Sequence, residues 1–216
     1  MRAGSPAQRL YELFGAALGL AALVLQFVIT IGLTTRNGMS LAGGIVFYFS
    51  FFTILSNILV VLSYGAPLAA PDSALGRFFA RGSVKTAVAL YILVVGLVYF
   101  VILRHTWQPQ GWQLVADVTL HYATPVLYLV YWLAFVDKAG LRYGGMALWL
   151  VFPTAYCVYA LVRGALVGLY PYPFLEANKI GYGQAAVNIL ALVALFTVLG
   201  LLIVTAGRAL ARRARA

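Results

Sequence analysis

The sequence is poor in charge. Only 9% of its 216 residues are Asp, Glu, Lys or Arg, and just five of these are acidic. A soluble domain has about 25% charged and roughly 45–50% apolar residues, whereas 63% of this chain is apolar. A globule of this size has no core large enough to hide so much apolar surface from water. The composition therefore excludes a soluble domain, and it excludes intrinsic disorder, which needs low hydrophobicity. It indicates a bilayer.

Cysteine and histidine are nearly absent as well. The one cysteine, Cys157, lies within an apolar run, which excludes a disulfide scaffold. Two histidines, His105 and His121, with one cysteine fall short of the ligand set of a closed zinc site. We therefore expect neither a metal nor any other cofactor. The sequence also has no Gly-x-Ser-Gly-like motif, which counts against a rhomboid-like serine protease.

Long apolar runs take the place of charge. A membrane-spanning helix needs about 20 mostly apolar residues, and turn-forming stretches such as Asn37-Gly38 separate runs of this length. The alternation typical of barrel strands is absent. Helices satisfy their own backbone hydrogen bonds in lipid. We predict an all-α membrane protein with a single domain over residues 1–216 and six transmembrane helices in one bundle. The predicted spans are roughly 10–33, 45–66, 83–103, 114–136, 146–167 and 182–206.

The basic residues orient these spans. If the N-terminus is cytoplasmic, eleven Lys and Arg residues fall inside and four outside, in agreement with the positive-inside rule. Both termini are then cytoplasmic, as an even number of spans requires. Residues 207–216 are predicted to form a basic cytoplasmic tail that anchors to lipid headgroups. Topology thus accounts for the net charge of +10 without a nucleic-acid partner. We expect a multi-pass protein of the cell membrane.

Polar side chains within the spans are few, and each is a candidate functional group because its burial in lipid is costly. The fourth span holds Asp117 and His121, four residues apart and so on one helix face. The second span holds Thr53 and Asn57 with the same spacing. At a rise of about 1.5 Å per residue, Thr53 lies roughly 12 Å and His121 about 10 Å below the outer ends of their spans.

The first, fifth and sixth spans place polar side chains in the same outer layer of the bilayer. These are Gln26, Thr30, Arg163, Gln184 and Asn188. Bundled helices would gather them into one polar pocket, in which Asn57, Arg163 and Asn188 are candidate donors to a developing oxyanion. The structural alternative is that the amides form interhelical hydrogen bonds and that Arg163 extends to the headgroups.

Thr53 and His121 are the candidate catalytic pair. A Thr hydroxyl becomes a good nucleophile only when a base takes its proton, and a neutral imidazole suits that task near pH 7. Asp117 is a candidate to orient the imidazole, as the third group of a triad does. The structural alternatives are a Thr53 bond to the carbonyl one turn back, packing of His121, and capping by Asp117. In the functional interpretation the reaction is hydrolysis of an acyl ester drawn from the lipid.

The predicted outer loop at residues 168–176 contains two prolines, which forbid a regular helix. We interpret it as a structured lid over the pocket, with Glu176 or Arg163 making a fixing contact. The alternative is an aromatic belt at the membrane surface. The candidate lid residues are Tyr172, Pro173, Phe174 and Glu176.

Several stretches resemble a known family. The most specific are Phe51–Asn57, His121 with Thr124-Pro125, Tyr131-Trp132, Arg163-Gly164 and Tyr172–Glu176. With these the chain resembles the bacterial six-helix membrane proteins related to the androgen-induced protein and the androgen-dependent TFPI-regulating protein. Animal members are threonine hydrolases that cleave fatty acid esters of hydroxy fatty acids. The resemblance implies a six-helix fold, a catalytic Thr at position 53, a catalytic His at position 121 and a membrane acyl lipid as substrate.

A second functional class stays open at this point, a non-catalytic lipid or small-molecule binder or carrier that uses the same pocket. A carrier needs polar residues through the inner half of the bilayer too, and only Thr86 and Ser63 stand out there. This favours an enzyme or a fixed binding site. A scaffold without a ligand is the third possibility, and the sequence does not indicate an oligomeric state.

Overall fold

The computed structural model describes residues 5–213, which form helices and contain no strand. The α-helices are α1 (Pro6–Arg36), α2 (Leu41–Tyr48), α3 (Phe52–Ala69), α4 (Ala74–Phe79), α5 (Gly82–Val101), α6 (Gly111–Val118), α7 (Thr124–Phe135), α8 (Met146–Val167), α9 (Ala177–Ile180) and α10 (Tyr182–Arg213). A π-helical turn, η2 (Thr119–Ala123), joins α6 to α7. Short 3₁₀ turns are η1 (Leu103–His105), η3 (Tyr143–Gly145) and η4 (Pro173–Leu175).

Six helical segments are long and apolar enough to cross a membrane, which confirms the predicted all-α class. They are Pro6–Arg36, Phe52–Ala69, Gly82–His105, Gly111–Phe135, Tyr143–Val167 and Tyr182–Arg213. Large apolar side chains cover the outside of the bundle, with Leu148 76% and Leu166 79% exposed. Helices that are apolar all round are typical of membrane spans.

Local sequence explains where these helices start and stop. The hydroxyls of Ser5 and Ser40 accept hydrogen bonds from backbone N–H groups in the first turns of α1 and α2, which satisfies donors that a helix start leaves free. Gly168 ends α8 with a left-handed φ of 72°, a conformation that glycine adopts without steric cost.

The second predicted span, 45–66, is not one helix. Its first part ends at Tyr48, and the chain restarts as a helix at Phe52. The hydroxyl of Ser50 donates to the carbonyl of Val46, which competes with the regular backbone ladder. The freed carbonyl of Ser50 accepts from the hydroxyl of Tyr156 at 2.8 Å. A side chain from α8 thus satisfies the broken backbone, as a lipid environment requires.

Two other predicted segments differ in detail from the structure. The fourth span, 114–136, contains the π turn, whose cause is given with the site below. Helix α10 continues to Arg213, so the predicted tail at 207–216 begins as helix. Its last residues, 214–216, lie outside the described residues.

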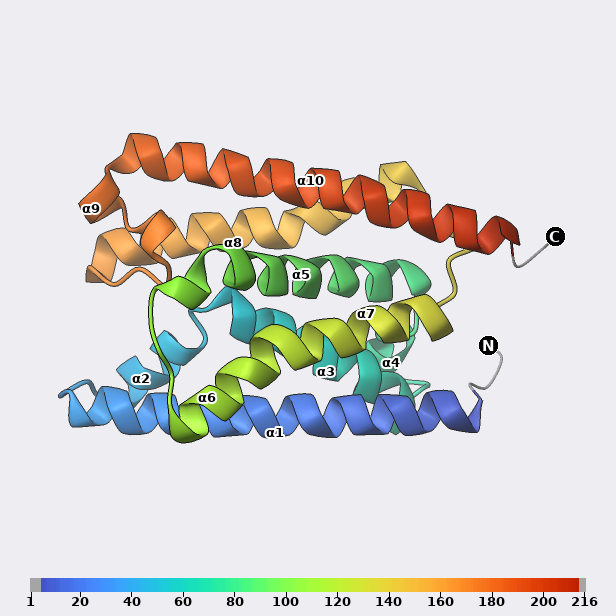
Figure 1. Ribbon diagram of the computed structural model, residues 1–216, viewed down its shortest axis with the longest axis horizontal. Coiled ribbons are helices and arrows are strands. Elements are labelled where there is room, and N and C mark those ends of the chain that lie inside the picture. The colour runs from blue at the N-terminus through green and yellow to red at the C-terminus, as the bar shows by residue number, and fades with distance from the viewer. Residues whose placement is uncertain (1–4, 214–216) are drawn as a thin grey trace.

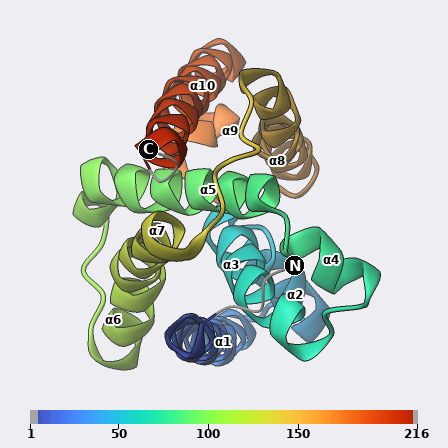
Figure 2. The same ribbon diagram turned by 90° about the vertical axis from the view of Figure 1, so that its right-hand side faces the viewer.

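Helix α5 runs through the middle of the bundle. Figures 1 and 2 show it with α8 and α10 on one side and α1, α3, α6 and α7 on the other. Its side chains from Lys85 to Ile92 are all buried, as expected for a helix with neighbours on both sides. The first turn of α1 and the last turn of α10 lie at the same end of the bundle, called here the termini end (Figure 1).

A buried ion pair lies near the termini end. The Lys85 ammonium is 3.3 Å from Oε1 of Glu12, and the hydroxyl of Tyr131 contacts both groups. Glu12 and Lys85 are 4% and 7% exposed. The expectation that this half of the bundle holds few polar groups was therefore wrong. The reason is that α1 and α5 each bring one ionisable residue from a terminal turn into the same contact.

Candidate active site

Thr53 lies in the first turn of α3, directly after the break in the second span. Phe51, the residue that precedes the helix, provides no side-chain cap. The N–H of Thr53 instead donates to the hydroxyl of Tyr172, at 3.2 Å, from the connection between α8 and α10. A residue far away in the sequence thus satisfies a free donor at a helix start. The break therefore places a Thr side chain at a helix N-terminus within the bundle.

His121 lies in the middle of the π turn. Pro125, four residues later, has no N–H to give to the carbonyl of His121, and a proline ring crowds that carbonyl. This is a physical reason for the widened turn. Gly96 on α5 faces the same carbonyl, because a Cβ there would lie 3.3 Å from it. Single π turns inside helices are frequent at functional sites.

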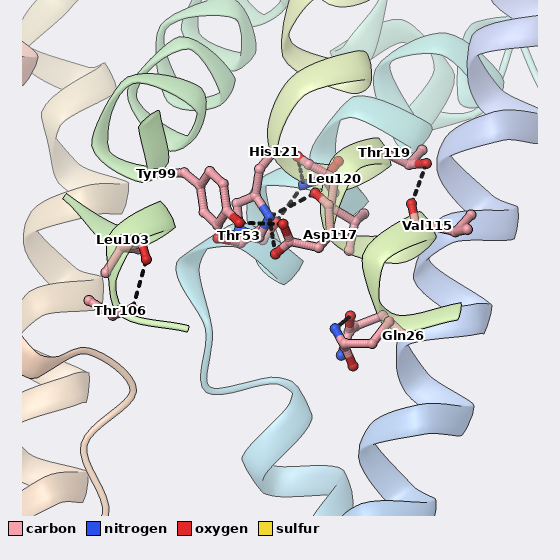
Figure 3. A network of polar contacts seen from close by, with 12 residues as sticks. Gln26, Thr53, Tyr99, Leu103, Thr106, Val115, Asp117, Thr119, Leu120 and His121 are labelled. Atoms are coloured by element: carbon pink, nitrogen blue, oxygen red, sulfur yellow. Dashed lines mark hydrogen bonds and ion pairs between the residues drawn. The ribbon is translucent and has the colours of Figure 1, made fainter. Parts of the chain in front are cut away.

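The Thr53 and His121 side chains meet across the bundle. Oγ1 of Thr53 is 3.3 Å from Nε2 of His121. The other ring nitrogen, Nδ1, lies 3.0 Å from the carbonyl oxygen of Asp117. A carbonyl only accepts, so Nδ1 carries the hydrogen and Nε2 is free to accept the hydroxyl hydrogen of Thr53. Figure 3 shows this chain of contacts from Asp117 through His121 to Thr53.

Asp117 and Tyr99 hold the imidazole from two sides. Oδ1 of Asp117 is 3.3 Å from Nδ1 of His121, and the carboxylate accepts a hydrogen bond from the hydroxyl of Tyr99. The Tyr99 ring stacks on the imidazole, with centroids 4.0 Å apart. Asp117 is 2% exposed. The carboxylate is thus positioned to stabilise a positive charge on His121.

Asn57 ties the two halves of the site together. Its amide nitrogen donates to the carbonyl of Thr53 at 2.9 Å and to the carbonyl of Leu120, in the π turn, at 3.3 Å. Both amide hydrogens are therefore used within the framework. Asn57 positions Thr53 against the π turn and is not a free donor for an oxyanion.

The α8–α10 connection, residues 168–181, folds back over this region as a structured cover. The Arg163 guanidinium donates to the carbonyl of Leu169 at 2.7 Å, and the Asn188 amide donates to the carbonyl of Phe174 at 2.8 Å. Helix α8 therefore fixes the start of the connection and α10 fixes its middle. Glu176 forms its ion pair with Lys179, at 3.0 Å, within the connection.

Tyr172 is the part of this cover that reaches the site. Its ring stacks on Phe174, with centroids 5.1 Å apart and planes 4° apart. Its hydroxyl is 3.3 Å from Oγ1 of Thr53. Burial raises the pKa of Tyr172, so the phenol keeps its hydrogen at neutral pH. Because the hydroxyl oxygen accepts from the N–H of Thr53, its own hydrogen is available to donate.

Thr53 stands between two cavities. The larger, about 360 Å³, is lined by Thr53, Asp117, His121, Tyr172 and Pro173 together with polar and aromatic residues that include Gln26, Thr30, Tyr99, Trp107 and Gln113. The smaller, about 50 Å³, is mostly apolar and includes Val94, Val98, Cys157, Phe174, Leu192 and Phe196. Thr53 and Tyr172 line both. A group bonded to Thr53 thus has space on two sides.

A polar wall faces the catalytic pair across the larger cavity. The side-chain amide nitrogen of Gln113 donates to Oε1 of Gln26 at 2.8 Å. The side-chain amide nitrogen of Gln26 donates to the hydroxyl of Thr30 at 3.1 Å. The sequence predicted that the first span contributes polar side chains to the pocket, and Gln26 and Thr30 of that span line the larger cavity.

The structure does not bring every candidate to this pocket. Arg163 and Asn188 line neither cavity, because their side chains bond the α8–α10 connection. The Gln184 amide donates to Asn188 at 3.0 Å. Helix α5 lies between α10 and the helices that carry the catalytic pair (Figure 2). The prediction that five spans, including the fifth and sixth, converge on one pocket is therefore too broad.

Two contributors were missed in the sequence, Tyr99 and Gln113. Tyr99 is one of 14 tyrosines, and no spacing relates it to Asp117. Gln113 precedes the predicted fourth span by one residue. Only the packing of α5 against the π turn reveals the first, and only the earlier start of α6 reveals the second.

No family model, curated protein or solved structure matches this chain. The family resemblance therefore stays a prediction. Within residues 5–213, no three His, Cys, Asp or Glu side chains are grouped closely enough to hold a metal ion.

Proposed function

We propose that this protein is a membrane lipid-ester hydrolase in which Thr53 is the nucleophile and His121 the general base. The observation that carries the proposal is the 3.3 Å contact between Oγ1 of Thr53 and Nε2 of His121. The contact lies on the wall of a cavity of about 360 Å³. The other ring nitrogen of His121, Nδ1, donates to the carbonyl of Asp117. This is the arrangement of nucleophile, base and orienting group that acyl transfer needs.

The first half of the proposed reaction forms an acyl–Thr53 ester. Nε2 of His121 takes the hydroxyl proton as Oγ1 of Thr53 attacks the ester carbonyl carbon. The carbonyl oxygen becomes an oxyanion, and the Tyr172 hydroxyl, 3.3 Å from Oγ1 of Thr53, is the candidate donor to it. The tetrahedral intermediate collapses, the bond to the alcohol oxygen breaks, and the alcohol leaves with the proton from Nε2.

The second half releases the acid. Nε2 of His121 takes a proton from water as the water oxygen attacks the acyl–Thr53 carbonyl. The bond to Oγ1 breaks, the fatty acid leaves, and Thr53 recovers the proton from Nε2. Asp117 supports the imidazolium formed in each half. One ester and one water thus give one alcohol and one acid, with no cofactor.

The surroundings of Thr53 support an acyl lipid as the proposed substrate class. The small apolar cavity suits part of an acyl chain, and the larger cavity, with its Gln26–Gln113 wall, suits a more polar portion. The resemblance to the family of the androgen-induced protein names fatty acid esters of hydroxy fatty acids as the first esters to test.

Labelling with a lipid-like fluorophosphonate tests the proposal. Detergent-purified wild type is compared with Thr53→Ala, His121→Ala and the matched control Thr119→Ala. Thr119 lies two residues from His121, is half-buried and lines neither cavity, and its hydroxyl donates to the carbonyl of Val115 at 2.7 Å. We expect wild type and Thr119→Ala to carry the adduct on the peptide that contains Thr53, and the other two variants to lose labelling while still folded.

Absence of the adduct from well-folded wild type would contradict the hydrolase and favour the alternative, a binder or carrier that uses the same cavity. The polar wall from Gln113 through Gln26 to Thr30 is the feature that supports this alternative, because it takes no part in the proposed chemistry. Its mark would be a lipid that co-purifies with wild type and is lost in Gln26→Leu.

A further inference from the structure

A separate cavity lined by positive charge lies at the termini end of the bundle. It has a volume of about 630 Å³ and lies between the α7–α8 connection (residues 136–145) and the last turns of α10. Figure 1 shows these two segments meeting where α10 finishes. None of the lining residues is acidic, and the basic ones are Lys138, Arg142, Arg208 and Arg212.

The walls of this basic cavity are fixed by polar contacts. The hydroxyls of Tyr143 and Thr205 are 3.0 Å apart and tie the α7–α8 connection to α10. The guanidinium of Arg208 lies over the Tyr143 ring, 5.1 Å from its centroid. The Lys138 ammonium donates to the carbonyl of Val136 at 2.7 Å and is 8% exposed. These contacts hold two of the four positive charges, those of Lys138 and Arg208, in place.

Within residues 5–213, no carboxylate lines this cavity. Of the five side-chain carboxylates, Glu12 pairs with Lys85 and Glu176 with Lys179, and Asp117 accepts from Tyr99 beside His121. Asp137 accepts from the N–H of Ala139 at 2.9 Å and does not line the cavity. Within residues 5–213, the three arginines of the basic cavity form no ion pair. The arginines of the basic cavity are therefore open to an anionic ligand.

The position of the cavity indicates what kind of anion. The neighbouring part of α10 exposes apolar side chains, with Leu201 42%, Leu202 59% and Leu210 37% exposed. An anion that also carries acyl chains fits a basic cavity at the end of such a surface. Basic pockets between transmembrane helices are sites for anionic lipid headgroups, and arginine binds phosphate oxygens with paired N–H groups.

We infer that the basic cavity binds the phosphodiester headgroup of an anionic phospholipid, whose acyl chains lie along the exposed apolar face of α10. The site is independent of the Thr53 chemistry, because it lies at the opposite end of the bundle from the α8–α10 connection (Figure 1). Its chemical preference is a negative phosphodiester without a choline cation.

Topology alone also places basic residues at this end, and two of them provide the matched control. Arg77, in α4, and Arg81, just before α5, are exposed and belong to the same end of the bundle, where Figure 1 shows α4. They do not line the basic cavity. Arg77 donates to the carbonyl of Asp72, and Arg81 lies over the Phe78 ring. Removing this pair changes the net charge equally and leaves the cavity intact.

Native mass spectrometry and thermal unfolding of the detergent-purified full chain test the inference. The probes are phosphatidylglycerol, phosphatidylcholine with the same acyl chains, and soluble glycerol phosphate. Wild type is compared with the double variant Arg208→Gln/Arg212→Gln and with the control Arg77→Gln/Arg81→Gln. Each basic residue near an anionic surface contributes about a factor of five in affinity. We expect phosphatidylglycerol binding to fall roughly 25-fold in the cavity variant and to stay near wild type in the control.

Binding should also raise the unfolding temperature of wild type with phosphatidylglycerol and not with phosphatidylcholine, because a ligand specific for the native state stabilises it. Equal binding of the two lipids by wild type would overturn the inference. So would an equal loss in the control variant, which would indicate general surface charge. Equal stabilisation by glycerol phosphate would assign the cavity to a free phosphate ester and would refute the lipid.

Discussion

At the scale of single residues, the hydroxyl of Tyr172 has two roles in the proposed site. It accepts from the N–H of Thr53 and lies 3.3 Å from Oγ1 of the same residue. The ring has a separate role, since it stacks on Phe174. Removing the hydroxyl alone therefore separates chemistry from packing.

We predict that Tyr172→Phe folds like wild type and lowers kcat for ester hydrolysis by about 10²-fold, the order expected for loss of one oxyanion donor. KM should change much less, because the ring that lines both cavities remains. Steady-state kinetics on a chromogenic acyl ester measures this. The control is Tyr170→Phe in the same connection, whose hydroxyl is 3.5 Å from Asn178 and far from Thr53. Equal losses of kcat in both variants would refute the role of Tyr172.

The positions of some of these residues could be predicted from the sequence, and those of others could not. The depth of Thr53 and His121 in their spans predicts that they share a layer, and the structure places their side chains in contact. The same argument predicted that Arg163 and Asn188 lie in that layer, but it could not tell that their side chains line neither cavity. Depth gives the position along the membrane normal, and only packing gives the position around the bundle.

At the scale of elements, the site is built where two helices are irregular. The α2–α3 break puts Thr53 at a helix start, and the π turn before Pro125 turns His121 toward it. Apolar run length predicted both spans but passed over both irregularities, because hydropathy is insensitive to the backbone ladder. The residues that accompany these two irregularities are Ser50 and Pro125. Neither residue predicts an irregularity by itself, because serine and proline are also tolerated within membrane helices.

The buried pair between α1 and α5 belongs to this scale too. Lys85 and Glu12 are 3.3 Å apart and nearly inaccessible. We predict that Lys85→Met alone destabilises the protein by about 3–5 kcal/mol, because it leaves the buried Glu12 carboxylate without a cation to pair with. The double variant Glu12→Gln/Lys85→Met should recover most of the loss, since neither charge remains. Thermal unfolding in detergent measures both.

Phosphonate labelling of Thr53 gives the control for this experiment. The ion pair lies toward the termini end, away from the cavity at Thr53, so labelling below the unfolding temperature should match wild type in every variant. If the double variant is as unstable as Lys85→Met, the pair is not what fixes α1 against α5.

At the scale of the whole molecule, the basic cavity and the cavity at Thr53 lie toward opposite ends of the bundle. Six apolar spans in one bundle were predictable, because run length and turn residues report them directly. The first turn of α1 and the last turn of α10 share one end, which an even number of spans requires (Figure 1). The α8–α10 connection and its Tyr172 lie at the other end. Which end faces the cytoplasm decides which leaflet supplies the ester.

We predict that the termini end is cytoplasmic, because eleven of the 15 basic residues fall on that side. Single cysteines in a Cys157→Ala background test this in intact cells with a membrane-impermeant maleimide. Gln110→Cys, exposed at the start of α6, should label at once, and Ala139→Cys, exposed between α7 and α8, should label only after permeabilisation. The reverse pattern would move the Thr53 cavity into the cytoplasmic leaflet and the basic cavity into the opposite one. The ester and the anionic lipid would then have to come from the other leaflets, so this measurement decides which lipids each site can meet.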